Sequence, residues 1–295
     1  MTVRAAGATG AWRGLDVVLL VLVLITLILS APLDAAERVI LNGLLTQGGM
    51  VVGQAEPGAA VSLDGEALQV GPNGQFVFGF DRDQGPRATL DIVHKDGSVE
   101  HRVLIIKARE YAIQHIDGLP PAQVTPRTKE QIAHIQRDQK MKRQARENGS
   151  RGMWFAQKFI WPLTGPLTGF YGSQRILNGK PRRPHYGVDI AAPAGTNFVA
   201  PAGGVVTLAS EDMYFEGGLI FLDHGYGITS AFLHLNSVAV AVGDEVKQGD
   251  VLGTVGARGR ATGPHLDWRM DWKGRHLDPT FLVGPMPDAE PAVVH

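Results

Sequence analysis

The sequence predicts a mainly β protein in which two strand-rich regions are joined by a helical linker. Glycine and proline are abundant, 37 and 18 of 295 residues, which favours short strands and many turns over a helical bundle. The turn pairs Asp64-Gly65 and Asn73-Gly74 separate short β-type runs and are typical of hairpins. A chain of this length has room for about two domains.

Composition excludes several classes of site. The net charge of −1 gives no reason to expect a nucleic-acid partner. There is no cysteine, which excludes disulfides, thiolate zinc sites, a cysteine nucleophile and a lipoprotein anchor. Any zinc ion must therefore be held by histidine and carboxylate side chains.

Residues 1–36 have the layout of a secretory signal peptide. Arg4 and Arg13 precede an apolar run over 17–29, and small residues follow it. As a helix this run is about 20 Å long, shorter than the roughly 30 Å hydrocarbon core of a membrane. The alternative is an uncleaved anchor that extends over residues 15–33. Both readings predict an exported chain, with membrane contact only through this segment.

Residues 37–110 predict a small β-sandwich of the immunoglobulin-like kind, because turns recur at regular spacing between short strands. The region holds no cluster of ionisable groups with the spacing of a site, so we interpret it as a positioning or protein-binding module. His94 and His101 flank a turn and are expected to be solvated.

Residues 111–150 read as a proline-containing linker followed by a polar helix over about 127–147. This helix carries seven Lys or Arg against three acids. We expect a solvated connecting helix, with His134 lacking partners; the alternative is a basic helix that touches an anionic membrane or cell-wall polymer.

Residues 151–285 form the second strand-rich region, before a tail over 286–295. Here His185 and Asp189 lie four apart in an extended, bent segment with Pro184 and Gly187. In the apolar strand around His234, simple alternation puts this histidine on the same face as Phe232.

A further pair lies near the end of this region. His265 and Asp267 are two apart and project from one face of a strand, with Leu266 and Trp268 on the other.

These side chains can form a hydrolytic zinc site. Three ligands with an open position for water are typical of catalytic zinc, and His185, Asp189 and Asp267 can supply them. His234 and His265 would remain beside the open position, where one can take a proton and the other can stabilise an oxyanion.

Five segments in this order resemble the LytM-type M23 metallopeptidase domain over about 130 residues; they are 183–190, 194–206, 232–235, 242–250 and 262–267. The resemblance implies an antiparallel β fold of the barrel-sandwich-hybrid kind with a groove, one zinc ion per chain, and cleavage of peptidoglycan stem peptides. It also implies zinc binding by His185 and Asp189 and catalysis by His234 and His265.

The sequence departs from the family at Asp267, where a histidine is usual. A carboxylate oxygen is a legitimate zinc ligand, so we predict an active zinc metalloendopeptidase with Asp267 as third ligand. The main alternative is a catalytically impaired LytM-like regulator that binds cell wall and activates an amidase.

A second alternative is a carrier module, because 242–252 also resembles the hairpin of biotinyl and lipoyl domains. That reading leaves the site histidines unexplained, and it places Lys247 inside the motif where those domains carry their modified lysine at an exposed tip.

The linker around 113–126 resembles that of exported proteobacterial members and favours a periplasmic setting. There, D,D-endopeptidase activity on D-alanine–diaminopimelate cross-links is expected, with other cell-wall enzymes as candidate partners of the N-terminal region. Arg175, Arg182 and Arg183 are candidates to bind stem-peptide carboxylates in the groove, or else surface charges.

Overall fold

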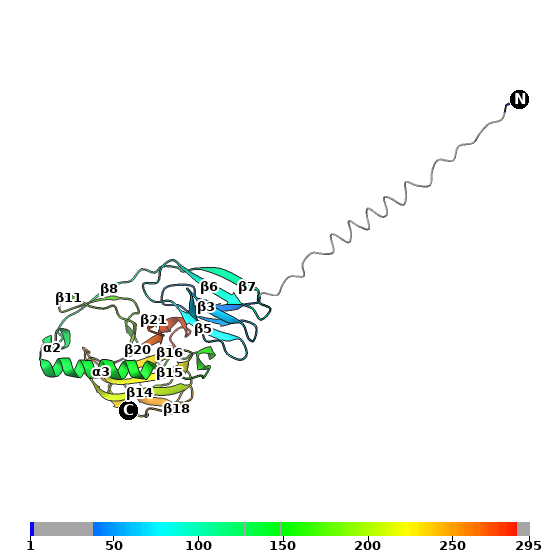
Figure 1. Cartoon of the computed structure of the whole chain (residues 1–295). Helices are drawn as coiled ribbons and strands as arrows, with labels where there is room; N and C mark the ends of the chain where they lie inside the picture. Colours follow the sequence, from blue (N-terminus) through cyan, green and yellow to red (C-terminus); the bar gives the residue numbers. More distant parts are fainter. Residues whose placement is uncertain (3–37, 127, 148, 288–295) are drawn as a thin grey trace. The chain divides into compact units, whose positions relative to one another are not determined.

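The computed structural model describes residues 1–2, 38–126, 128–147 and 149–287 (Figure 1). The predicted signal segment lies almost wholly outside the described residues, as does most of the predicted tail. The chain divides into two compact units, 1–38 and 39–295, and everything below concerns the second. Within the described ranges, no helix is long and apolar enough to cross a membrane.

The prediction of a mainly β chain is confirmed. The N-terminal region holds two antiparallel sheets, with strand orders β1-β2-β5 and β4-β3-β6-β7. Their strands are β1 (Ile40–Gly43), β2 (Met50–Gln54), β3 (Ala60–Leu63), β4 (Glu66–Ala67), β5 (Gln75–Gly79), β6 (Arg87–Val93) and β7 (Val99–Ile105). Alternation along β6 buries Ala88, Leu90 and Ile92, as a strand with one face on a core requires.

His94 differs from the prediction of a solvated side chain. It is buried, and its two ring nitrogens lie 3.1 Å from Glu56 Oε1 and 3.2 Å from Glu100 Oε2. The two carboxylates satisfy both nitrogens, which explains why this imidazole can be buried. His101 is exposed, as expected, and contacts Asp91.

The C-terminal region is built on one eight-stranded sheet, β18-β14-β15-β16-β20-β12-β9, with β21 beside β20. Its strands are β9 (Leu167–Gly169), β12 (Gly187–Ala191), β14 (Gly204–Met213), β15 (Gly217–Gly225), β16 (Ile228–Leu235), β18 (Glu245–Val246), β20 (His265–Trp272) and β21 (Arg275–Leu277). A smaller sheet contains β13 (Asn197–Val199), β17 (Ser237–Val238) and β19 (Val251–Thr254). Short 3₁₀ helices lie at Trp154–Ala156 and Pro279–Phe281.

The main sheet is covered on both faces, which explains why β15 and β16 are buried along their whole length and rich in apolar residues. Phe232 and Trp268 face the main core. On the opposite face, Phe221 and Leu233 belong to a second apolar cluster, against which Met141 and Ala145 of a helix pack.

That helix is α3 (Lys129–Glu147), and it differs from the solvated spacer that the sequence predicted. It follows β8 (Ile113–Ile116) and the short α2 (Pro121–Val124). β8 pairs in parallel with β10 (Gln174–Leu177), which also pairs with β11 (Lys180–Pro181), so the linker is part of the fold.

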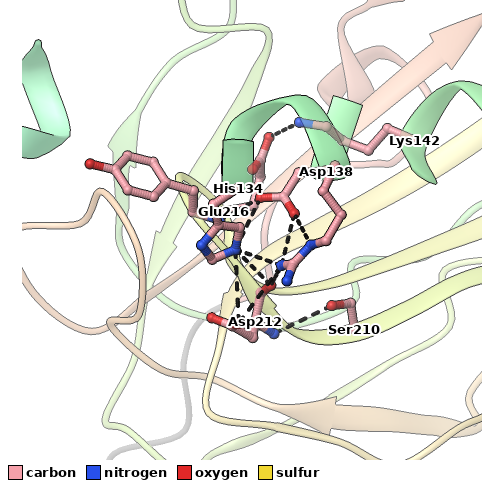
Figure 2. Close-up of polar contacts among 8 residues, drawn as sticks. His134, Asp138, Lys142, Ser210, Asp212 and Glu216 are labelled. Carbon is pink, nitrogen blue, oxygen red and sulfur yellow. Dashed lines mark hydrogen bonds and ion pairs between the residues drawn. The ribbon is translucent and has the colours of Figure 1, made fainter. Parts of the chain in front are cut away.

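Polar contacts hold α3 on the sheet (Figure 2). Asp138 is buried, and its Oδ2 accepts a hydrogen bond of 2.7 Å from the backbone N–H of Tyr214. His134, predicted to lack partners, lies 3.4 Å from Asp138 Oδ2 and 3.8 Å from Asp212 Oδ2. Lys142 forms an ion pair with Glu216. Helix α3 is therefore anchored along most of its length.

Candidate metal centre and groove

Two neighbouring strands bring the predicted ligands together. In the antiparallel register of β12 and β20, Asp189 lies directly opposite Asp267, so the two carboxylates share one face. His185 precedes β12, and its backbone is fixed because its N–H donates to Ser173 O at 2.8 Å and its carbonyl accepts from Gly172 N at 2.7 Å. The bent segment expected around Pro184 and Gly187 thus returns His185 to the strand that carries Asp189.

His185, Asp189 and Asp267 are buried, with one ligand atom of each within 4.8 Å of the others. His185 Nε2 lies 3.1 Å from Asp189 Oδ1. Two zinc ligands at ordinary bond lengths in a tetrahedral site are about 3.3 Å apart, so this pair fits one ion. Apart from this contact with each other, both ring nitrogens of His185 and Oδ1 of Asp189 lack a hydrogen-bond partner. Buried unsatisfied polar atoms are rare, and these have the chemistry of metal ligands.

Each carboxylate also has an arginine partner. Arg175 Nη2 donates to Asp189 Oδ2 at 2.7 Å and leaves Oδ1 facing His185. Arg269 forms a bidentate ion pair with Asp267, in which Nε donates to Oδ1 at 3.0 Å and Nη2 donates to Oδ2 at 2.5 Å. Burial alone would raise the pKa of Asp267, but the adjacent Arg269 and His185 hold it well below its usual range. Asp267 is therefore ionised, with its charge shared with a guanidinium.

Arg269 is a site residue that the sequence analysis missed. The signal was available, because residues 265, 267 and 269 of one strand project from the same face. An arginine two residues beyond an aspartate on such a face can reach it. Arg175 is not a surface charge, since it contacts Asp189.

His234 and His265 lie side by side, with ring centroids 4.9 Å apart. Their Nδ1 atoms donate at 2.8 Å to the carbonyls of Arg258 and Gly263 respectively, which leaves each Nε2 as the available nitrogen. His265 Nε2 lies 3.8 Å from Asp189 Oδ1. This places the histidine pair beside the three candidate metal ligands His185, Asp189 and Asp267 (the metal cluster). Burial lowers the pKa of His234 to about 4, so its imidazole is neutral near pH 7.

The face predicted for His234 was wrong. Its φ is +66°, in the left-handed region, and the pairing of β15 with β16 shifts register nearby. This break in alternation puts Leu235 in the main core with Phe232, so His234 is freed to face His265. At β20 the alternation is regular, and Leu266 and Trp268 face the core as expected.

Two cavities adjoin these side chains. The smaller, about 130 Å³, is lined by Asp189, His234, His265 and Arg260, and by linker residues Gln114, Ile116 and Leu119. The larger, about 410 Å³, continues over the sheet face beneath α3 and is lined by Phe221, Leu233 and many basic side chains. The two cavities share the lining residues Arg175, Leu177 and Arg260, and the smaller one borders Asp189.

The part of the chain that contains this site is similar to known proteins. Residues 183–279 match the model of peptidase family M23. A crystal structure of a Pseudomonas aeruginosa protein assigned to peptidase M23 superposes with a TM-score of 0.62 at 28% identity, covering 82% of this chain and 96% of that one.

Curated relatives match over a shorter stretch. The chain is 33% identical to the cell division protein DipM of Caulobacter vibrioides over 132 residues, 43% of this chain and 21% of DipM. It is 38% identical to the peptidoglycan DD-endopeptidase ShyC of Vibrio cholerae over 101 residues, 34% and 23% of the two chains. It is 36% identical to the DD-carboxypeptidase/endopeptidase Mpg of Neisseria meningitidis over 106 residues, 36% and 24%. The chain thus spans about a fifth to a quarter of the length of these relatives.

Proposed function

We propose that this chain, whose residues 183–279 match the model of peptidase family M23, is an exported zinc metalloendopeptidase that hydrolyses peptide cross-links of peptidoglycan. The observation that carries the proposal is the buried pair His185 and Asp189, whose facing atoms lie 3.1 Å apart, have no other polar partner that would satisfy them, and fit one ion. The names of the relatives ShyC and Mpg support the substrate class.

In this proposal His185, Asp189 and Asp267 hold one zinc ion, which would polarise the scissile carbonyl and acidify a water molecule. The neutral Nε2 of His234 is suited to accept a proton from that water. His265, whose ring is oriented by the contact of Nδ1 with Gly263 O, lies beside His234 and is the candidate to stabilise the developing oxyanion. In the periplasm the D-alanine–diaminopimelate bond is the expected target.

The test is a paired measurement of metal content and turnover on the chain from residue 37 onward. We expect about one zinc ion per chain, lost in His185→Ala, and soluble muropeptides from purified sacculi. His265→Ala should keep most of the zinc and lose turnover.

Background metal in zinc-supplemented protein would contradict the proposal. Zinc-loaded protein that releases no muropeptides and instead stimulates an amidase would favour the regulatory alternative.

A further inference from the structure

The larger cavity is lined by more cationic than acidic side chains, so part of its positive charge is not neutralised. Its cationic lining residues are Lys142, Arg146, Arg175, Arg182, Arg183, Arg260 and Arg269, and its acids are Glu216 and Asp271. Lys142 pairs with Glu216, and Arg146 lies 3.9 Å from Asp271. Arg175 and Arg269 pair with the two aspartates of the metal cluster. Among the described residues, three of the seven cations therefore have no carboxylate partner: Arg182, Arg183 and Arg260.

Arg260 stands apart from the other two because it lines both cavities. It borders the larger groove and also the small cavity that contains Asp189, His234 and His265. Arg182 is already engaged, since it donates to Val124 O at 3.0 Å and contacts Thr125 Oγ1. Arg183 lines only the larger cavity.

The position of Arg260 is fixed although its charge is unpaired. Its backbone N–H donates to Phe215 O at 2.7 Å, and its guanidinium lies over the Phe215 ring, 4.7 Å from the centroid. Burial and the nearby Arg269 and Arg175 lower its pKa to about 10, so it is still a cation at neutral pH. Arg260 is half-buried beside other cations, and an anion bound there would reduce their mutual repulsion.

The cross-link expected for this enzyme supplies such an anion beside the scissile bond. In a D-alanine–diaminopimelate cross-link, the carbon that carries the scissile nitrogen also carries a free carboxylate. We propose that Arg260 binds this carboxylate and so positions the scissile amide at the metal cluster. The inference rests on the proposed function and adds a recognition element, a carboxylate next to the leaving nitrogen.

The test compares two cross-linked muropeptides that differ only at this group, one with the free carboxylate and one with it amidated. Charge-assisted hydrogen bonds to a carboxylate contribute about 1.5–3 kcal/mol, so the parent protein should prefer the free acid by about 10- to 100-fold in kcat/KM. Arg260→Gln should lose this preference because its kcat/KM falls much further on the free acid than on the amidated peptide, while its zinc content stays that of the parent. Arg260→Lys should recover part of it, and Arg151→Gln, an exposed arginine outside both cavities, should match the parent.

Binding and stability give readouts that do not need turnover. Calorimetry with the free-acid and amidated peptides should show the same preference in the parent and its loss in Arg260→Gln. Without peptide, Arg260→Gln should be at least as stable as the parent, because the substitution relieves repulsion between cations. Equal use and equal binding of the two peptides by the parent would overturn the inference, as would an equal loss on both peptides in Arg260→Gln. If the parent cleaves neither peptide, the proposed function fails and the calorimetric comparison still decides the role of Arg260.

Discussion

At the scale of single residues, the decisive feature is that Asp267 has two roles. It is a candidate metal ligand, and it forms an ion pair with Arg269. It lies within 4.8 Å of His185 and Asp189 through one ligand atom of each, yet both of its oxygens accept from Arg269. The guanidinium stabilises the buried carboxylate when no ion is bound, and it reduces the negative charge offered to one. In the proposed zinc site, an arginine and the metal would therefore compete for the same two oxygens.

This competition predicts the effect of Arg269→Gln. Without zinc the variant should lose about 3 kcal/mol of unfolding free energy, because a fully buried carboxylate loses its charged partner. With zinc, much of that loss should be recovered and the affinity should rise about tenfold, as the carboxylate is released to the ion. Chemical denaturation with and without zinc measures both effects. Arg87→Gln, at an exposed position, is the control. A zinc affinity that does not change would show that Asp267 is not a ligand.

At the scale of elements, α3 is a covering layer, and its anchor is Asp138. This side chain accepts from Tyr214 N and lies beside His134 and Arg137. Met141 and Ala145 add apolar contacts one turn further on. The helix is otherwise polar, so its position depends on a few contacts more than on a broad apolar face.

Asp138→Ala should therefore loosen α3 without unfolding the sheet. We expect a loss of about 1–3 kcal/mol from the unpaired backbone N–H of Tyr214 and the lost ion pairs. Hydrogen exchange in 129–147 should accelerate by one to two orders of magnitude, while exchange in β16 stays slow. Asp138→Asn keeps an acceptor for the Tyr214 N–H, so its exchange rate in 129–147 should lie between those of the parent and Asp138→Ala. Lys140→Ala, at an exposed position of the same helix, should exchange like the parent. Uniform acceleration across the sheet would contradict a local anchor.

The contacts of α3 also show where prediction from sequence stopped. Strand regions, the pair His185 and Asp189, and the common face of His265 and Asp267 follow from local spacing, and the structure has them. The burial of His94 and the anchoring of α3 depend on partners far away in the chain, such as Glu56 and Tyr214. The contact of Arg269 with Asp267 was missed although both lie on one face of the same strand. The face of His234 was missed because one residue of positive φ breaks a period of two.

At the scale of the whole molecule, the N-terminal sheets and the main sheet contribute to one continuous apolar cluster that contains Phe76, Leu90, Phe232 and Trp268. An ion pair lies at the same junction, with Arg109 Nη1 2.9 Å from Asp278 Oδ2. Asp278 is almost fully buried and also accepts from Thr280 N at 3.0 Å.

Arg109→Met should consequently lower stability by about 3 kcal/mol, because a buried carboxylate loses its partner. The loss should appear in a single denaturation transition if both regions unfold together, and Arg87→Met should leave the midpoint unchanged. Two separated transitions in the parent would show that the regions unfold independently.

The wall that Gln114, Ile116 and Leu119 give to the small cavity lies outside residues 183–279, the part that matches the family model. Two proteins that both contain the matched module can therefore differ in this wall, and with it in the peptides that reach His234 and His265. A fragment cut to the module alone would keep the ligands and lose the wall. The peptide selectivity measured on such a fragment would therefore differ from that of the longer chain. An inhibitor that contacts this wall would discriminate among proteins that share the same candidate metal ligands.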